Sequence, residues 1–208
     1  MAQSLNVARW IERSAVNGPG ERFVLWLQGC PLRCSGCWNP DTWDFAPRHL
    51  LRPEQLVDLV RGVAAIEGVT LTGGEPFAQA ESLVPAIRKL RSHGLSLMVF
   101  TGYEMTELSA PAAQELLEMT DILVSGRYRE AERSEALAWR GSSNQEIRFL
   151  TGRYSESDLR SGAEMRVEAH IGLSGEVTLT GFPEIGLVGD VGSTERGNMH
   201  RRRAPSTQ

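Results

Sequence analysis

The chain has 208 residues, of which 41% are hydrophobic and 23% are charged, a composition typical of one soluble globular domain. Its 22 basic and 26 acidic side chains give a net charge of −4, so bulk electrostatics favours neither nucleic acid nor a membrane surface as a partner. The first residues lack the apolar region of a signal peptide, and no apolar run reaches the ~18 residues that cross a bilayer, which predicts a cytoplasmic protein.

Short apolar, β-branched runs alternate with helical patterns along most of the chain. The expected strands cover residues 23–28, 69–72, 95–101, 122–124 and 147–150. Three helices are expected between them: one opening at Pro53, one over residues 80–93, and one from Pro111 to about Asp121. This alternation predicts an α/β fold with parallel strands, right-handed crossovers and reactive groups at the carboxyl ends of the strands.

The pattern changes after residue 150. Two runs, 166–171 and 177–181, flank the turn-forming segment 172–175 and predict a small antiparallel β-hairpin. From residue 187 onward the glycines and the triplet Arg201-Arg202-Arg203 leave little to bury, so a disordered tail is expected. The expected organisation is therefore a core domain over 17–150, a strand and hairpin appendage over 151–186, and a tail over 187–208.

All three cysteines, Cys30, Cys34 and Cys37, directly follow the first expected strand. Their odd number and the lack of a distant cysteine argue against a disulfide framework. Three thiolates in one loop indicate an iron–sulfur cluster, and three ligands for four irons leave one iron open for chemistry. The alternative is a zinc site completed by His49, but structural zinc usually takes its ligands from two short hairpins, and the second is missing.

The C-x₃-C-x₂-C spacing is the signature of the radical S-adenosylmethionine superfamily, and its surroundings resemble the glycyl-radical activating branch of that superfamily. The segments that carry the resemblance are Asn17-Gly-Pro-Gly20-x-Arg22, Gln28-Gly29-Cys30, Cys37-Trp38-Asn39-Pro40, Gly73-Gly74-Glu75-Pro76, Phe100-Thr101-Gly102-Tyr103, Ile122-Leu-Val-Ser-Gly126 and Trp139-Arg-Gly-Ser-Ser-Asn-Gln145. Within the branch they resemble the anaerobic ribonucleotide reductase activating proteins. Short motifs in the right order and context are stronger evidence than any one alone.

The resemblance implies a partial, open parallel β/α barrel with the hairpin as a C-terminal appendage. It also implies a [4Fe–4S] cluster on Cys30, Cys34 and Cys37, with S-adenosylmethionine at the open iron. A flavodoxin-like or ferredoxin-like protein would reduce the cluster, and the 5′-deoxyadenosyl radical made from S-adenosylmethionine would take a hydrogen from a glycine of a partner enzyme. The residues expected to bind S-adenosylmethionine are Trp38, Gly73, Gly74, Glu75, Pro76, Thr101 and Gly102.

The residues themselves support these roles to different degrees. Gly73 and Gly74 let the backbone approach a ligand closely, with the amino group of S-adenosylmethionine as the implied ligand. Trp38 either shields the cluster or fills the core. The segment 139–145 is either a plain surface loop or a docking site, in which Arg140 and Asn144 would hydrogen-bond a glycine-containing segment.

Two other functions stay open. A radical enzyme of the same superfamily would modify a peptide or a small molecule, with the hairpin helping to present it. A non-catalytic electron-transfer or sensor protein would keep the cluster but have no use for the glycine motif. One departure bears on the choice: Ser125 stands where the resemblance leads us to expect an aspartate, whose role is then absent or moved to Asp121.

Overall fold

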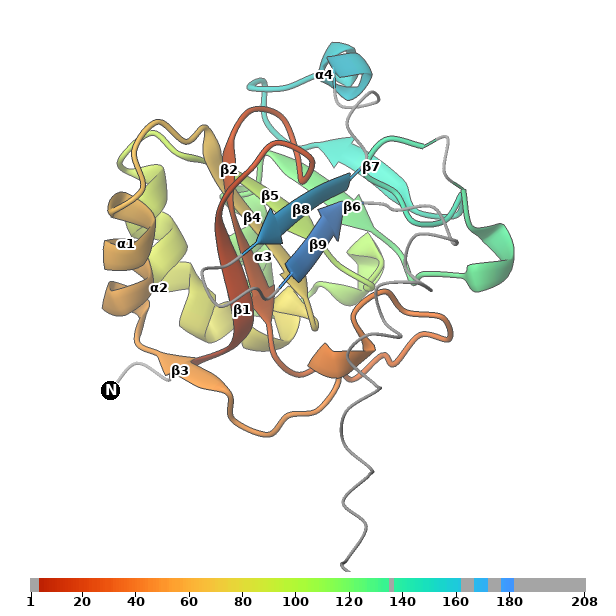
Figure 1. The fold of residues 1–208 in the computed structure, drawn as a ribbon, viewed down its shortest axis with the longest axis horizontal. Coiled ribbons are helices and arrows are strands. Elements are labelled where there is room, and N and C mark those ends of the chain that lie inside the picture. Colours follow the sequence, from red (N-terminus) through yellow and green to blue (C-terminus); the bar gives the residue numbers. More distant parts are fainter. Residues whose placement is uncertain (1–3, 135–136, 162–166, 172–176, 182–208) are drawn as a thin grey trace, which may run out of the picture.

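The computed structural model describes residues 4–134, 137–161, 167–171 and 177–181. They form a seven-stranded sheet with helices against it and a separate two-stranded hairpin (Figure 1). The sheet contains β1 (Leu5–Ser14), β2 (Arg22–Leu27), β3 (His49–Leu51), β4 (Gly68–Gly73), β5 (Ser96–Phe100), β6 (Ile122–Ser125) and β7 (Glu146–Phe149). The helices are α1 (Pro53–Arg61), α2 (Ala80–Arg91), α3 (Pro111–Glu118) and α4 (Glu156–Ser161). None of these described helices is long and apolar enough to cross a membrane.

The centre of the sheet follows the predicted alternation. The strand order is β3-β1-β2-β4-β5-β6-β7, and the strands β2, β4, β5 and β6 run parallel to one another. Helices α1, α2 and α3 lie between these strands in the chain, close to where they were expected. The protein is therefore α/β with a mostly parallel central sheet, as the sequence predicts.

The margins of the sheet differ from the predicted pattern. The last expected strand is β7, which runs antiparallel to β6. A parallel strand needs a crossover of a dozen or more residues, usually a helix, and the described part of the connection from β6 to β7 holds only a short 3₁₀ turn, η4 (Glu130–Glu132). Strands β1 and β3, antiparallel neighbours on the other side, were not predicted. Charged residues such as Arg9, Glu12 and Arg13 interrupt the apolar pattern of β1.

Helices cover one face of the sheet because successive right-handed crossovers place them on the same side. The largest apolar cluster lies between this face and the helices, and it includes Phe23, Leu25 and Leu27 of β2. The expected apolar stripe of α2 is buried here: Leu83, Val84, Ile87 and Leu90. The alternate β2 residues Val24 and Trp26 belong to a separate cluster, as the two-residue period of a strand requires.

The predicted hairpin is present as β8 (Val167–Ile171) and β9 (Val177–Gly181), which pair antiparallel. In Figure 1 it lies on the opposite side of β1 and β2 from α1 and α2. It is not a free appendage, because the Ala15 amide donates to Glu168 Oε1 at 2.8 Å and Asn17 Nδ2 donates to Thr180 Oγ1 at 2.7 Å. The expected turn at 172–175 and the expected tail at 187–208 lie outside the described residues.

Candidate functional site

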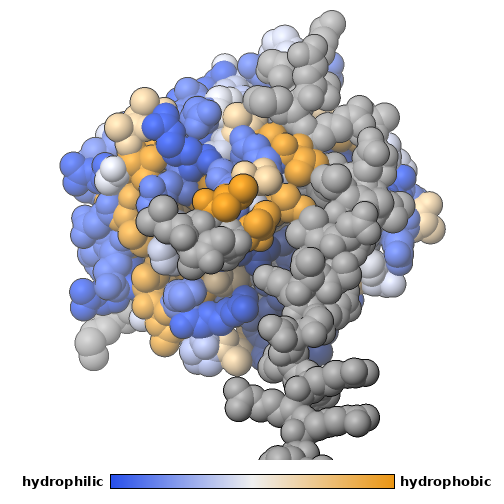
Figure 2. Space-filling model, in the orientation of Figure 1, coloured by the Kyte–Doolittle hydropathy of each residue, from blue (hydrophilic) through white to orange (hydrophobic). Residues whose placement is uncertain are grey.

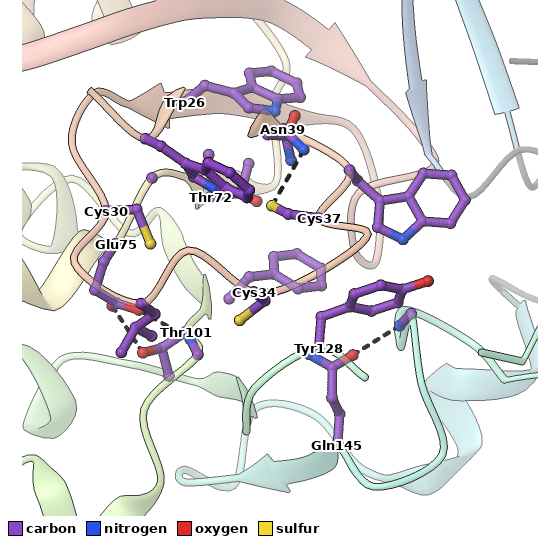
Figure 3. A pocket seen from close by; sticks show the side chains of 18 of the residues that line it. Trp26, Cys30, Cys34, Cys37, Asn39, Thr72, Glu75, Thr101, Tyr128 and Gln145 are labelled. Atoms are coloured by element: carbon purple, nitrogen blue, oxygen red, sulfur yellow. Dashed lines mark hydrogen bonds between the residues drawn. The ribbon is translucent and has the colours of Figure 1, made fainter. Parts of the chain in front are cut away.

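The three cysteines lie in the loop that follows β2, at the carboxyl end of that strand. Gly29 and Cys30 donate their amides to Thr42 O at 2.8 Å and Trp43 O at 3.1 Å, so the chain after the cysteines holds the entrance of the loop. Farther along, the Cys37 amide donates to Cys34 O at 3.2 Å, which closes a tight turn. All three thiols are free and line one cavity of about 260 Å³ (Figure 3). The three predicted cluster ligands therefore line the same cavity.

The surroundings of the thiols set their protonation. Burial raises the pKa of Cys30, and backbone amides of Arg33 and Leu32 offset part of that increase. Burial likewise raises the pKa of Cys34, with the backbone of Tyr128 acting in the opposite direction. Both shifts disfavour the thiolates of Cys30 and Cys34, and binding iron, which requires thiolates, would release protons.

His49, the fourth ligand expected in the zinc alternative, does not lie at the cavity. His49 lies on β3 with its ring edge-on to Trp10, at 5.7 Å between ring centroids, and it is not among the described residues that line the cavity. Across the part of the chain that the structure describes, no three His, Cys, Asp or Glu side chains are gathered closely enough to hold a single metal ion. Because the same holds for Cys30, Cys34 and Cys37, it is the position of His49 that disfavours zinc.

The Gly73-Gly74-Glu75-Pro76 motif is bound directly to the cysteine loop. Gly74 N donates to Leu27 O at 2.8 Å, and Glu75 N donates to Gly29 O at 2.9 Å. A Cβ on Gly74 would lie only 2.4 Å from Gly29 O. The structure thus shows a reason for glycine at this position that the sequence did not predict, a close approach to the cysteine loop, while the approach to a ligand stays a prediction.

Glu75 is buried at the end of the motif and uses both carboxylate oxygens within the protein. Phe77 N donates to Oε1 at 3.0 Å, Thr101 Oγ1 donates to the same atom at 2.8 Å, and Gly102 N donates to Oε2 at 2.9 Å. Burial nevertheless outweighs these donors and raises the pKa of Glu75 to about 7. Thr101 and Gly102, which were expected to contact the cofactor, thereby fix the carboxylate of Glu75 as well (Figure 3).

Six of the seven residues expected to bind S-adenosylmethionine line the cavity, namely Trp38, Gly73, Gly74, Glu75, Thr101 and Gly102. The exception is Pro76, which is buried at the start of the 3₁₀ turn η2 (Pro76–Gln79) and is not among the described lining residues. Trp38 forms part of the cavity wall and carries the Arg133 guanidinium over its ring, at 4.2 Å from the ring centroid.

Several lining residues were not among the predicted site residues. They are Asn17, Trp26, Leu32, Asn39, Trp43, Thr72, Phe100, Gly126, Tyr128, Gly141, Gln145, Leu179, Thr180 and Gly181. Six of them nevertheless lie in the motifs that carry the family resemblance, namely Asn17, Asn39, Phe100, Gly126, Gly141 and Gln145. Strand alternation carries a signal for two of them, because Trp26 and Thr72 are partners in the β2–β4 register and share the face opposite the large helical core. The hairpin residues have no local signal, since only the tertiary fold brings β9 to the cavity.

The segment from Trp139 to Gln145 is not a plain surface loop. Trp139 is 2% exposed and packs in a cluster with Met98, Ile122 and Val124. The side chain of Gln145 donates to Gly126 O at 3.0 Å and accepts from Gly141 N at 2.8 Å.

The two side chains expected to bind a substrate segment also hydrogen-bond the protein. Asn144 Nδ2 donates to Arg127 O at 2.9 Å, and Arg140 Nη1 donates to Gln145 O at 3.4 Å. Asn144 Oδ1 and Arg140 Nε are buried without a partner among the described residues, so the docking role of Arg140 and Asn144 stays a prediction.

The position of Asp121 bears on the aspartate expected at Ser125. Ser125 is the last residue of β6 and is buried, whereas Asp121 precedes the same strand at its amino end. The Asp121 carboxylate is bound by Arg91, by Leu97 N at 2.8 Å and by Thr151 Oγ1 at 2.7 Å. Of the two alternatives, a role moved to Asp121 has no support, because the length of β6 separates this carboxylate from the cavity and Asp121 is not among the described lining residues. The alternative that the role is absent stays a prediction.

The cavity fits an iron–sulfur cluster with an open position and an organic ligand beside it. It presents three thiols, and the chain has no fourth cysteine. The indole N–H of Trp43 is buried in its lining and meets no acceptor among the described residues. Among the lining glycines, Gly126 leaves room beside the wall, with the nearest atom 3.6 Å from its Cβ position, whereas a Cβ on Gly74, Gly102 or Gly141 would meet protein atoms at 2.4–3.0 Å.

Comparisons with known proteins agree with this chemistry. A family model for the 4Fe-4S single cluster domain matches residues 16–148. The anaerobic ribonucleoside-triphosphate reductase-activating protein of Pasteurella multocida is 32% identical over 156 residues, which cover 71% of this chain and 99% of that protein. The protein of the same name from Escherichia coli K12 is 30% identical over 154 residues, with 70% and 99% covered. Enterobacteria phage T4 has one that is 32% identical over 139 residues, with 64% and 86% covered.

Among solved structures, QueE from Escherichia coli is 22% identical and covers 48% of this chain and 52% of its own, but its TM-score of 0.36 carries no argument about the fold. The family of this chain is shown by the family model and by the relatives. The chain belongs to the 4Fe-4S single cluster domain family and, within it, to the anaerobic ribonucleoside-triphosphate reductase-activating proteins, radical S-adenosylmethionine enzymes whose cofactors are a [4Fe–4S] cluster and S-adenosylmethionine.

Proposed function

We propose that this chain generates the glycyl radical of an anaerobic ribonucleoside-triphosphate reductase. The observation that carries the proposal is the meeting of three free cysteines and the Gly73-Gly74-Glu75 motif in one cavity. The names of the relatives supply the substrate, since they are reductase-activating proteins that this chain matches over nearly their whole length.

In this proposal Cys30, Cys34 and Cys37 hold the cluster and leave one iron open for S-adenosylmethionine. The other proposed contacts come from the cavity wall at Trp38, Gly73, Gly74, Glu75, Thr101 and Gly102. When bound, the reduced cluster and S-adenosylmethionine supply a carbon-centred radical that removes a hydrogen atom from a C–H bond.

The protein's own residues orient the cofactors and exclude water. Glu75 fixes the turn at Thr101 and Gly102 through the hydrogen bonds described above, so the ends of β4 and β5 form one rigid surface. Trp26, Trp38 and Tyr128 supply aromatic side chains to the wall of the cavity. Such a wall lowers solvent access to a reactive radical, which protects it from side reactions.

We also propose a fold type, a cellular compartment, an electron donor and domain bounds for this chain. The four parallel strands and their helices support a partial, open β/α barrel of the radical S-adenosylmethionine type. Three free thiols are consistent with a reducing cytoplasm, where a flavodoxin-like or ferredoxin-like protein would deliver the electron. We further propose a core domain over 17–150 and a hairpin appendage over 151–186.

A second candidate is a radical enzyme that modifies another peptide, and one observation favours it. Leu179, Thr180 and Gly181 of the hairpin line the cavity, although the family match ends at residue 148. An added wall is a means of changing the substrate while keeping the cofactor chemistry.

Electron paramagnetic resonance distinguishes the proposed activase from an enzyme that modifies another peptide. Anaerobically reconstituted protein, with S-adenosylmethionine, dithionite and the anaerobic ribonucleoside-triphosphate reductase of the same organism, is expected to raise a glycyl radical signal on the reductase. Cys34→Ala protein serves as the matched control and gives no signal. Cleavage of S-adenosylmethionine without any radical on the reductase would reject the activase and favour the second candidate.

A further inference from the structure

One wall of the cavity lies outside the residues that the family model matches. Leu179, Thr180 and Gly181, at the end of β9, line the cavity together with the cysteine loop. The family match ends at residue 148. Because 71% of this chain covers 99% of the Pasteurella multocida relative, the chain carries additional residues, and the hairpin is a structured part of the region after the match.

Asn17 holds this wall in place. Its Nδ2 donates to Thr180 Oγ1 at 2.7 Å and to Ser14 Oγ at 2.9 Å, and Asn17 and Thr180 are 6% and 5% exposed. Thr180 is the register partner of Glu168, whose Oε1 accepts from Ala15 N at 2.8 Å. One face of the hairpin is therefore anchored by hydrogen bonds, and breaking the buried one would leave its partner unsatisfied.

The other face of the hairpin carries Leu179 of the cavity wall and also exposed apolar residues. Ile171 and Val177 are register partners on it, with 74% and 45% of their surface exposed. Figure 2 shows apolar surface near the centre of the same view in which Figure 1 draws the hairpin. Val177 is not among the described residues of the cavity lining, so it provides a control position on the same strand as Thr180.

The chemistry of the cavity limits what can lie against this wall. Its described lining has no Lys, Arg or His, and its carboxylate, Glu75, already accepts three hydrogen bonds. The hydroxyls of Thr72 and Tyr128 have no partner among the described residues. A phosphate would lack a counter-charge here, whereas the amides of a main chain find hydroxyl partners.

We infer that the β8–β9 hairpin is the selectivity wall of this site. Asn17 positions it through Thr180, and Leu179 to Gly181 contact the main chain of the substrate segment next to the reacting carbon. Gly181, with φ of 99°, adds no side chain at this wall. The identity of the segment rests on the proposed function, but the selection by the wall rests on its position and its chemistry. Asn17 is a positioning residue, because it acts through Thr180.

Thr180→Val tests the positioning, since it removes the hydroxyl and keeps the shape. The probe is a short fluorescent peptide with the target glycine of the reductase, titrated onto reconstituted protein. We expect its affinity to fall about fivefold, as for one lost hydrogen bond. Hydrogen exchange in residues 167–171 and 177–181 is expected to become faster. Val177→Thr, on the same strand, is the control and should change neither measurement.

Leu179→Asp tests the contact directly and carries the test if Thr180→Val fails to fold. A carboxylate in this wall is expected to weaken peptide binding about tenfold or more, because it must be desolvated against the substrate. Parent-like peptide affinity in Leu179→Asp, or faster exchange without loss of affinity in Thr180→Val, would overturn the inference. Parent protein that binds the peptide with this same dependence but raises no glycyl radical would instead overturn the proposed function alone.

Discussion

At the amino ends of β2, β4, β5 and β6, buried polar side chains bind one another, whereas at the carboxyl ends they surround a cavity. Arg22, fully buried at the start of β2, donates to Thr70 Oγ1, Pro19 O, Ser96 Oγ and Val69 O at distances from 2.7 to 3.1 Å. The Tyr154 hydroxyl extends this network to Glu67 Oε1 at 2.6 Å. The carboxyl ends instead present three thiols and the indole N–H of Trp43 to the cavity.

The difference separates stability from function. Buried polar groups are normally satisfied within the protein, so a network such as that of Arg22 needs no ligand. Unsatisfied groups that face a cavity mark the place where a ligand would complete the structure. Changes at the amino ends should therefore alter folding, and changes at the carboxyl ends should alter cofactor binding.

The largest expected effect is at the cavity. Cys34→Ala removes one of three proposed cluster ligands and is expected to abolish cluster assembly and cleavage of S-adenosylmethionine. The unfolding free energy of the cluster-free protein should change by less than about 1 kcal/mol, since the main interaction lost by the Cys34 thiol is its contact with the Tyr128 backbone. Iron analysis and thermal melts measure both, with Ser35→Ala as the control. Full iron content in Cys34→Ala would contradict the assignment of cofactor binding to the carboxyl ends of the strands.

Gly74→Val lies where the two cavity loops meet and should affect both properties. The new Cβ would lie 2.4 Å from Gly29 O, so one of the two loops must move. We expect loss of most of the iron together with about 2–3 kcal/mol of stability. Gly152→Val is the matched control, because nothing lies within 4 Å of its Cβ position. A Gly74→Val protein with normal iron content would show that the loops do not depend on this contact.

Asp121→Ala tests whether the buried polar side chains at the amino ends of the strands serve stability alone. It removes the partner of Arg91, Leu97 N and Thr151 at a position that is 1% exposed, which is expected to cost about 3–4 kcal/mol of stability. Cluster content in the folded fraction should be unchanged. Chemical denaturation measures the first and iron analysis the second, with the exposed Asp58→Ala as control. Loss of iron at temperatures where the variant is folded would contradict the separation.

Glu75 should make the stability of the cluster-free protein depend on pH. Its pKa is raised from 4.5 to about 7 in the folded state, so folding favours the protonated carboxyl. Stability is then full below about pH 4.5 and falls as the pH rises to about 7, by at most about 3 kcal/mol. Denaturation across this range measures the slope, which Glu75→Gln should remove. Equal slopes in parent and variant would mean that Glu75 titrates normally.

The smallest expected effect concerns Arg9, which reaches the cavity loop from β1. It donates to Asn39 Oδ1 at 2.7 Å and pairs with Asp41 at 2.7 Å, with 31% of its side chain exposed. Arg9→Ala is expected to lower stability by less than about 1 kcal/mol and to speed hydrogen exchange in residues 39–43. Arg13→Ala is the control, because Arg13 lies on the same strand as Arg9 and its ion pair is with Glu21. Equal exchange in the two variants would remove Arg9 from the support of the site.

The sequence predicted the features that local spacing encodes. Hydrophobic periods predicted the parallel strands and the buried stripe of α2, and the cysteine spacing predicted a shared cavity. It did not predict the partner of Asn17, because Thr180 lies 163 residues away. It offered Asp121 as one alternative for the role expected at Ser125 because four residues look close in sequence, yet in a strand they span about 13 Å. Local patterns predict elements and motifs, whereas the pairing of distant side chains depends on the whole fold.

The most direct test of the account is whether three cysteines leave one iron open to S-adenosylmethionine. Electron paramagnetic resonance of the anaerobically reconstituted, dithionite-reduced protein should show a [4Fe–4S] signal that changes when S-adenosylmethionine is added. Cys30→Ala, Cys34→Ala and Cys37→Ala proteins should each lose the signal. A cluster signal that is the same with and without S-adenosylmethionine, or stoichiometric zinc in place of iron, would contradict the account.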